Sequence, residues 1–312
     1  MKTVFMGTPE FAVPCLKLLR LMPEINLTGV VTQPDRPKGR GYHYAPPPVK
    51  ETAIKMNLPV VQPQTSSHPE LFSALREWDP ELIIVVAFGQ ILPETILRLP
   101  THGCINVHAS LLPKYRGAAP IQQSLIDGSK ITGITTMQMD TGMDTGPILM
   151  QDELTVSPRE TAVTLHDRLS VLGAVTLRRT IEALINGDLK ANPQNHDKAT
   201  YAPRLTKESG RINWNDSAEK IDCLVRGTQP WPTAYSSLNG KTIKIWKTRV
   251  IITGSSPYEP GMVIKADQNG LEVSTGSGRL LIEEMQLEGK KRMTVSQFLS
   301  GNRMEPKTRL GD

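Results

Sequence analysis

The apolar run Leu82–Ala87 is the feature that most limits how this chain of 312 residues can fold. Six consecutive apolar residues are typical of a strand that is buried on both faces of a parallel sheet. Helical segments separate this run from other strand-like runs at Lys2–Met6, Leu27–Thr32, Gly103–His108 and Ile131–Met139. The alternation of strands and helices predicts an α/β fold with an open, doubly wound, mostly parallel Rossmann-like sheet.

Two helices are indicated by the spacing of their apolar residues. The first follows Thr8 and Pro9, where we expect Thr8 to cap the helix and Pro9 to occupy its first position. The second covers residues 161–186 and ends at Asn186-Gly187, a typical C-terminal stop. In a doubly wound sheet the ligand binds at the carboxyl ends of the strands, so the loops there are the first place to look for a site.

Beyond Thr228 the pattern changes to short strands separated by turns, which predicts a small OB-like β-barrel. The pair Asn239-Gly240, between two strand-like runs, is a strong hairpin signal. We therefore expect an α/β domain over residues 1–189, a linker over 190–206 and a barrel domain over 207–312. The tryptophans of the last part are expected in the barrel core, at Trp214, Trp231 and Trp246.

Composition excludes several classes of protein. A chain with 38% hydrophobic and 21% charged residues is not disordered. No apolar run approaches the ~20 residues of a membrane helix, so no membrane association is expected. The N-terminus reaches Gly7-Thr8-Pro9 too early for a signal peptide. Three scattered cysteines form neither a disulfide framework nor a metal cluster, which favours a reducing, cytoplasmic compartment.

Charge is distributed unevenly along the chain. Residues 1–189 contain 17 basic and 18 acidic residues, a net charge of −1, whereas residues 190–312 contain 19 and 13, a net charge of +6. A basic C-terminal part indicates either a module that binds something anionic or an ordinary basic surface. Charge alone does not choose between these readings.

The pair Asn106 and His108 lies at the end of a predicted strand, two residues apart, so both side chains share one face of the sheet. An amide that donates to a developing oxyanion and an imidazole that moves a proton suit acyl transfer. The plainer alternative is that His108 merely caps a turn.

The sequence Asp-Thr-Gly occurs twice in one segment, at Asp140 and Asp144. An aspartic-protease pair is excluded, because such a pair takes one Asp from each of two distant lobes. Two interpretations remain open. Either both residues form turns in a Gly-rich loop, or one of them orients His108 and completes an Asn/His/Asp site.

The chain resembles the 10-formyltetrahydrofolate-dependent formyltransferases in the stretch Asn106-x-His108-x-Ser110-Leu111-Leu112-Pro113-x-Tyr115-Arg116-Gly117, followed by Asp144-x-Gly146. Further motifs are similar to the members of this family that act on methionyl initiator tRNA. They span nearly the whole chain in order: Gly7–Ala12, Thr32–Gly41, Pro48-Val49-Lys50, Ala118–Ile121, Tyr201-Ala202-Pro203, Arg226-Gly227 and Pro230-Trp231-Pro232.

The resemblance implies a role for each matching residue. Asn106, His108 and Asp144 match the catalytic triplet of the family, in the α/β domain. The segment Ser110, Leu111, Leu112 and Pro113 matches its folate-binding stretch, and the loop Phe88–Leu92 would help to line the pterin pocket. The implied co-substrate is 10-formyltetrahydrofolate, with no metal. Consistent with this, the chain has no G-x-G-x-x-G dinucleotide fingerprint.

The resemblance also implies that the partner is methionyl initiator tRNA, used in translation initiation. In the family the long loop at 33–49 meets the acceptor end of the tRNA, so Arg36, Lys38 and Arg40 are the expected nucleic-acid contacts. Tyr42-His43-Tyr44 departs from the family, whose members often carry lysines there. The barrel domain would bind the tRNA backbone through its Lys and Arg residues.

Two alternatives remain. A formyltransferase for a small amine, such as an amino sugar nucleotide or glycinamide ribonucleotide, would share the catalytic triplet but lack the basic loop and basic barrel. An RNA-binding protein without activity would have lost the triplet, which is intact here. We expect a monomer, because the tRNA supplies the large partner surface.

Overall fold

The computed structural model describes residues 1–38, 43–252, 257–305 and 308–311, without the side chains of Lys38, His43 and Ile252. The chain divides into two compact units. The first comprises Met1–Pro120, Ile131–Thr155 and His166–Ala202, and the second comprises Ile121–Lys130, Val156–Leu165 and Pro203–Asp312. The expected domain boundaries at 189 and 207 stay predictions.

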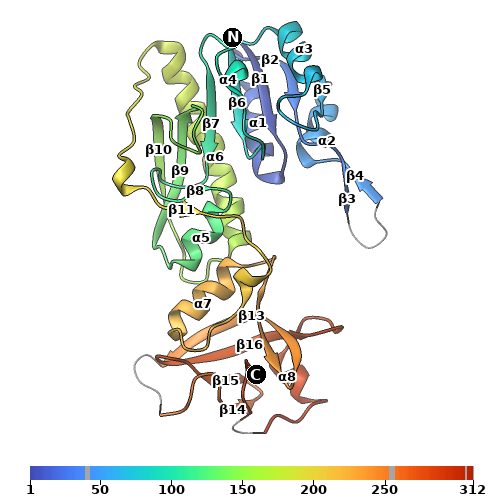
Figure 1. Cartoon of the computed structure of the whole chain (residues 1–312), viewed down its shortest axis with the longest axis vertical. Helices are drawn as coiled ribbons and strands as arrows, with labels where there is room; N and C mark the ends of the chain where they lie inside the picture. The colour runs from blue at the N-terminus through green and yellow to red at the C-terminus, as the bar shows by residue number, and fades with distance from the viewer. Residues whose placement is uncertain (39–42, 253–256, 306–307, 312) are drawn as a thin grey trace. The chain divides into compact units, whose positions relative to one another are not determined.

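The first unit is built on a seven-stranded sheet with the order β10-β9-β7-β6-β1-β2-β5 (Figure 1). The five strands β1, β2, β5, β6 and β7 pair in parallel, whereas β9 is antiparallel to β7 and β10 to β9. The predicted mostly parallel, Rossmann-like sheet is confirmed. Its strands are β1 (Lys2–Gly7), β2 (Asn26–Val31), β5 (Val60–Val61), β6 (Leu82–Val86), β7 (Cys104–His108), β9 (Ile131–Gln138) and β10 (Ile148–Thr155).

Helices pack on both faces of this sheet, as a doubly wound fold requires. Leu71 and Leu75 of α3 belong to one core cluster with Ile83 and Val85 of β6. On the opposite face, α6 approaches β7 closely at Gly173, where a Cβ would lie 3.3 Å from the Val107 side chain. The helices are α1 (Val13–Leu21), α2 (Pro48–Lys55), α3 (Pro69–Trp78), α4 (Glu94–Leu97) and α6 (Ala162–Asn186).

The sequence reading missed several short elements of the first unit. The long loop at 33–49 contains a hairpin of β3 (Arg36–Lys38) and β4 (His43–Ala45). A second small pairing joins β8 (Arg116–Gly117) in parallel to β11 (Tyr201–Ala202). Strand β10 was missed because its side chains alternate between half-buried and exposed and include polar residues, so no apolar run marks it.

The second unit contains an antiparallel sheet with the order β12-β13-β16-β15-β14, with β17 paired to β16. The predicted hairpin is confirmed: Asn239 and Gly240 both have positive φ, 51° and 72°, as a type I′ turn requires. The elements are β12 (Ala234–Leu238), β13 (Lys241–Ile252), β14 (Val263–Asp267), β15 (Gly270–Ser274), β16 (Arg279–Leu287) and β17 (Met293–Thr294), with helices α5 (Pro120–Ile126), α7 (Ala218–Gly227) and α8 (Val295–Leu299).

The segment 308–311 joins the two edge strands of this sheet. The Val263 N–H of β14 donates to the Thr308 carbonyl at 2.8 Å, and the Gly311 N–H donates to the Ser237 carbonyl of β12 at 3.0 Å. One short segment therefore hydrogen-bonds to both edges, and the sheet becomes a closed, barrel-like unit.

The three tryptophans differ in burial. Trp214 lies in the barrel core, as predicted, and its Nε1 donates to Ser236 Oγ at 2.9 Å. Trp246 is half-buried under the Arg292 guanidinium, 4.8 Å from the ring centroid. The prediction for Trp231 is wrong, since 53% of this residue is exposed. It lies in a proline-rich turn between α7 and β12 rather than in a strand, so no barrel face covers it.

Candidate active site

The carboxyl ends of β1, β6 and β7 lie side by side, because these strands are neighbours in the sheet. The Thr8 Oγ donates to the Phe88 carbonyl at 3.2 Å and accepts the Gln33 N–H at 3.4 Å. Thr8 makes no capping hydrogen bond to the helix that follows, so its predicted role as an N-cap is wrong. Its hydroxyl instead joins the loops that follow β1, β2 and β6.

Asn106 and His108 share the face of β7 that is opposite to Val107, as the two-residue spacing predicts. His108 is buried and Asn106 half-buried. Asp144 reaches both of them: its Oδ1 lies 3.5 Å from Asn106 Nδ2 and its Oδ2 lies 3.7 Å from His108 Nδ1. The structure thus brings the three expected catalytic side chains together, although Asp144 is 38 residues from Asn106.

The other nitrogen of His108 faces the backbone. His108 Nε2 lies 2.9 Å from the Tyr115 carbonyl oxygen, which can only accept a hydrogen bond, so Nε2 carries a proton. The ring nitrogen that faces the Asp144 carboxylate is then Nδ1. His108 therefore has one ring nitrogen toward a backbone carbonyl and the other toward a carboxylate.

The two Asp-Thr-Gly repeats have different roles. Asp140 accepts from the Gly142 N–H and the Thr145 hydroxyl within its own loop, so it is a turn former. Asp144 accepts the Gly117 N–H at 2.8 Å and faces His108. In the structure Asp140 therefore shapes the loop, whereas Asp144 lies against Asn106 and His108.

The expected folate-binding segment continues directly from β7. Ser110 and Leu112 are buried, whereas Leu111 and Pro113 are half-buried. The Ser110 hydroxyl donates to the Lys114 carbonyl at 2.6 Å, and the Leu112 N–H donates to the Thr135 hydroxyl at 3.0 Å. The polar groups of Ser110 and Leu112 thus hold the turn, which leaves Leu111 and Pro113 with surface available to a ligand.

The neighbouring loop at 88–92 combines buried anchors with an exposed tip. Phe88 and Leu92 are buried, while Ile91 is 78% exposed. Between them, Gln90 Oε1 is a buried acceptor with no hydrogen-bond partner in the described part of the chain. A buried acceptor without a donor is costly, so this atom is suited to a donor from a ligand.

The basic loop is anchored at its base. Asp35 pairs with Lys50 at 2.7 Å and accepts from Gln62, and hydrogen bonds from these side chains lower the Asp35 pKa. Arg36 is exposed and donates to Gln33 Oε1 at 2.9 Å. Lys38 is the last residue of β3, and Arg40 lies outside the described residues, as do Gly39, Gly41 and Tyr42.

The barrel unit carries a strongly basic groove of about 400 Å³. Several of its cations are partly neutralised by carboxylates: Arg226 pairs with Asp222, and both Lys247 and Arg249 pair with Glu283. Five basic side chains line it, from the 156–165 segment, α7, β13 and the turn between β16 and β17: Arg159, Arg226, Lys247, Arg249 and Arg292.

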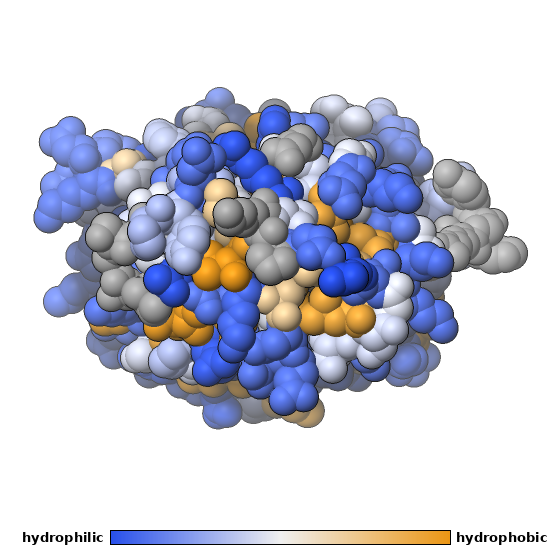
Figure 2. All heavy atoms as spheres, turned by 90° about the horizontal axis from the view of Figure 1, so that it is seen from below, coloured by the Kyte–Doolittle hydropathy of each residue, from blue (hydrophilic) through white to orange (hydrophobic). Residues whose placement is uncertain are grey.

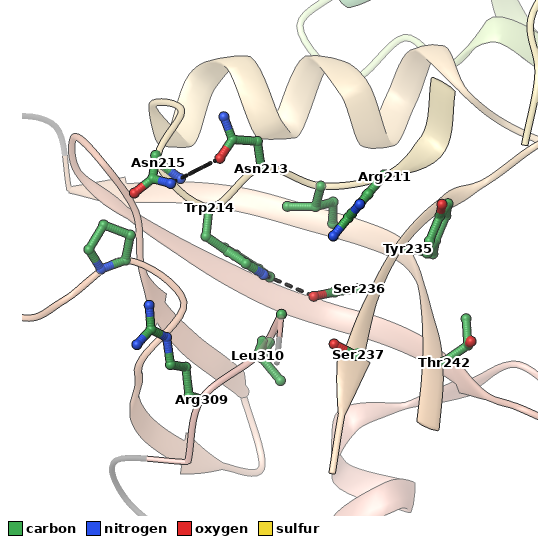
Figure 3. Close-up of a pocket in the computed structure, with 13 residues that line it drawn as sticks. Arg211, Asn213, Trp214, Asn215, Tyr235, Ser236, Ser237, Thr242, Arg309 and Leu310 are labelled. Carbon is green, nitrogen blue, oxygen red and sulfur yellow. Dashed lines mark hydrogen bonds between the residues drawn. The ribbon is translucent and has the colours of Figure 1, made fainter. Parts of the chain in front are cut away.

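A second groove, of about 590 Å³, lies where the segment 308–311 joins the barrel (Figure 3). Arg211, Tyr235 and Arg309 surround it, and Trp214 forms its floor through the hydrogen bond to Ser236 (Figure 3). Carboxylates are absent from its lining in the described residues. The lining is therefore rich in hydrogen-bond donors and cationic.

Among the described residues, no cluster of His, Cys, Asp and Glu side chains is arranged to hold a metal ion. In the same part of the chain, no helix combines the length and apolar character needed to cross a bilayer.

Sequence reasoning missed the groups that hold the cluster in place. The Tyr115 carbonyl and the Gly117 N–H contact His108 and Asp144 through the backbone, which side-chain identities do not reveal. Gln194 also was missed, although its Nε2 donates to the Asp144 carbonyl at 2.9 Å. The only sequence feature that pointed to these supporting groups was the pair Arg116-Gly117, which lies within the longest motif.

Comparison with known proteins agrees with this site. A family model described as formyl transferase matches residues 1–181, and one described as formyl transferase, C-terminal domain, matches residues 204–303. The chain belongs to the formyl transferase family.

Within that family it belongs with the methionyl-tRNA formyltransferases. It is 51% identical over 308 residues to the methionyl-tRNA formyltransferase of Geobacter metallireducens, covering 99% of this chain and 98% of the relative. It is 50% identical over 312 residues to that of Alkaliphilus oremlandii, covering 100% of both.

A solved structure supports the fold. The N-formyltransferase from Helicobacter canadensis, in complex with folinic acid and dTDP-3-aminofucose, has a TM-score of 0.67 and 17% identity, covering 90% of this chain and 98% of its own. At that identity the likeness shows the fold alone.

Proposed function

We propose that this chain transfers the formyl group of 10-formyltetrahydrofolate to the α-amine of methionyl initiator tRNA, giving N-formylmethionyl-tRNA for translation initiation. The carrying observation is the match at about 50% identity over the full length to curated methionyl-tRNA formyltransferases. The cluster of Asn106, His108 and Asp144 at the carboxyl ends of the strands supplies the groups that this chemistry needs.

Asn106 and His108 are proposed as donors to the formyl oxygen. The co-substrate supplies the one-carbon unit on its N10. A bond forms between the methionyl nitrogen and the formyl carbon, and the bond from that carbon to N10 breaks. Negative charge develops on the formyl oxygen meanwhile, and the Asn106 amide can donate to it. His108 would donate to the same oxygen by turning one ring nitrogen away from the Tyr115 carbonyl or the Asp144 carboxylate that it faces here.

His108 and Asp144 are proposed to handle the proton. The attacking amine must lose a proton, and N10 must gain one. Asp144 Oδ2 lies 3.7 Å from His108 Nδ1, so the two side chains are placed to pass a proton at that nitrogen. Replacement of His108 by Ala should abolish turnover while thermal unfolding stays close to that of the wild type. Wild-type turnover in this variant would remove His108 from the mechanism.

The folate is proposed to contact the segment Ser110, Leu111, Leu112 and Pro113 and the loop at 88–92. Leu111 and Pro113 offer apolar surface, whereas the Ser110 hydroxyl stays bonded within the turn. Gln90 Oε1, which has no hydrogen-bond partner among the described residues, offers an acceptor to a donor of the pterin ring.

The tRNA is proposed to contact the basic loop and the barrel. Arg36, Lys38 and Arg40 would meet the acceptor arm, where Arg36 is exposed. The two grooves of the barrel unit are lined by cations and would follow the phosphate backbone. The face of this unit seen in Figure 2 is mostly hydrophilic, with hydrophobic side chains in small separate patches, as suits a polar partner.

The test is formyl transfer from 10-formyltetrahydrofolate to charged initiator tRNA. The comparison acceptors are free methionine, an amino sugar nucleotide and glycinamide ribonucleotide. We expect turnover with the charged tRNA alone. Transfer to a small amine without transfer to tRNA would overturn the proposal in favour of a small-amine formyltransferase.

We propose a monomer that acts in the cytoplasm, where charged tRNA is consumed. Light scattering during size-exclusion chromatography tests the first, with 34.4 kDa expected for one chain. A stable species of twice that mass would contradict it.

A further inference from the structure

Arg116 is a buried cation whose partners are neutral. The residue is 2% exposed. Its Nε and Nη2 donate to Gln194 Oε1 at 3.2 and 2.6 Å, and its Nη2 donates to His196 Nδ1 at 3.2 Å. Within the described part of the chain, its hydrogen bonds reach no carboxylate. A buried guanidinium without a counter-charge is a poor source of stability, so its placement calls for another reason.

The backbone on either side of Arg116 holds the two charged members of the catalytic cluster. One residue before it, the Tyr115 carbonyl accepts from His108 Nε2 at 2.9 Å. One residue after it, the Gly117 N–H donates to Asp144 Oδ2 at 2.8 Å. A shift of Arg116 therefore moves the supports of both side chains at once.

Gln194 connects the Arg116 side chain to the loop that carries Asp144. Gln194 is 6% exposed, and its Nε2 donates to the Asp144 carbonyl at 2.9 Å and to the Gly146 carbonyl at 2.7 Å. Asp144 has a φ of 52°, a left-handed conformation that L side chains rarely adopt. Such a conformation persists only where the surroundings hold it, and the two bonds from Gln194 do so.

We propose that Arg116 and Gln194 form a buried positioning pair that fixes the Asp144 backbone and, with the Tyr115 carbonyl and the Gly117 N–H, sets the distance between Asp144 and His108. Gln194 contacts the backbone carbonyls of Asp144 and Gly146 and not the Asp144 carboxylate, so the pair acts through the Asp144 backbone. The effect on turnover rests on the proposed function, whereas the effect on geometry does not.

Two substitutions of Gln194 separate positioning from stability. Gln194→Glu keeps an oxygen for Arg116 and gives it a carboxylate partner, but it removes both N–H donors to the loop. Gln194→Ala removes all of these bonds. In Gln194→Glu a carboxylate oxygen would face the two carbonyl oxygens that the amide N–H groups now contact, so some loss of stability is expected on either reading. A purely structural pair predicts that the folded variant keeps the wild-type kcat. The positioning role predicts a lower kcat in the folded variant.

The control is Thr180→Val in the same unit. It removes a buried hydrogen bond between Thr180 and Thr136, 2.8 Å long, that is outside the catalytic cluster. We expect both Gln194 variants to lose about 100-fold in kcat, since a shift of 1 Å in a reacting group can cost that much, with KM for folate and tRNA nearly unchanged. Thr180→Val should keep the wild-type kcat. Wild-type kcat in Gln194→Glu would overturn the proposal.

Hydrogen exchange supplies a readout that needs no activity. The Gly117 amide, which bonds Asp144, should exchange faster in both Gln194 variants and at the wild-type rate in Thr180→Val. Unchanged protection of Gly117 in Gln194→Ala would overturn the proposal, even if turnover falls. An inactive wild type with altered Gly117 exchange in the variants would instead count against the proposed function alone.

Discussion

Asn106 offers the sharpest test of the chemistry, because two replacements change different interactions. Alanine removes a hydrogen-bond donor, whereas aspartate adds a negative charge. Asn106→Ala removes one donor to the formyl oxygen. The loss of one such donor costs about 3 kcal/mol of transition-state stabilisation, which is on the order of a 100-fold fall in kcat. Because the charge on that oxygen develops only during the reaction, KM for both substrates should stay nearly constant.

Asn106→Asp keeps the shape of the side chain but should be worse than Asn106→Ala at pH 8. Asn106 Nδ2 lies 3.5 Å from Asp144 Oδ1, so the new carboxylate would stand beside an existing one. At about 4 Å and an effective dielectric of 20, two like charges repel by about 4 kcal/mol. This repulsion raises the pKa of the pair, so the repulsion is lost as the pH falls through that raised value and one carboxyl takes up a proton.

The assay is single-turnover formyl transfer to charged initiator tRNA, with enzyme in excess, between pH 6 and 9. Asn106→Asp should recover activity toward low pH relative to Asn106→Ala, whose pH profile should follow the wild type. The reasoning is refuted if Asn106→Ala keeps kcat within about threefold of the wild type, well short of the loss expected for an oxyanion donor. It is also refuted if Asn106→Asp matches the wild type at pH 8.

Three further predictions concern the basic groove, a constrained glycine and the thiols. Arg159→Glu in the basic groove should raise KM for tRNA but not for folate. The control is Lys265→Glu, since Lys265 pairs with Asp267 outside both grooves, and it should change neither KM. Equal effects of the two substitutions on KM for tRNA would refute the groove assignment. Gly117→Ala should lower the free energy of unfolding in urea by about 2 kcal/mol, because φ is 114° and a Cβ would lie 2.8 Å from the Ala202 carbonyl oxygen; an unchanged urea midpoint would contradict this. Burial raises the pKa of the Cys15 and Cys104 thiols to about 12, so only about one in ten thousand is a thiolate at pH 8. A thiol reagent should therefore modify both only after unfolding, and fast reaction in the folded protein would argue against their burial.

Local sequence signals predicted much of the fold, because the predicted elements contain characteristic turn residues or a regular spacing of apolar residues. The hairpin at Asn239-Gly240 was found with both of its strands, since a type I′ turn needs those residue types. The long helix was expected at 161–186 and runs over Ala162–Asn186. Two features with weak sequence signals were missed. They are strand β10 at the sheet edge and the hairpin of β3 and β4 in a proline-rich loop.

The candidate site was only partly accessible from the sequence. Asn106 and His108 follow from their position at a strand end, but Asp144 could be separated from Asp140 only by three-dimensional contacts. At Thr8 the sequence pattern of a helix N-cap predicted a cap that the structure does not contain. The Thr8 hydroxyl instead hydrogen-bonds to two other loops. Arg116 and Gln194 meet across 78 residues, and no local pattern reports such a pair.

The second unit is not one continuous stretch of chain, and this limits how the protein can be divided or recombined. Residues 121–130 and 156–165 belong to it, together with everything after 202. Arg226 of α7 donates to the Glu160 carbonyl, and a Cβ on Gly128 would touch Cys223 Sγ. A fragment cut near 189 would therefore keep two segments whose packing partners are gone. A chimaera between two relatives would need matched sequence in all three segments, so a single crossover near residue 189 should give a poorly packed barrel unit even when both parents fold well.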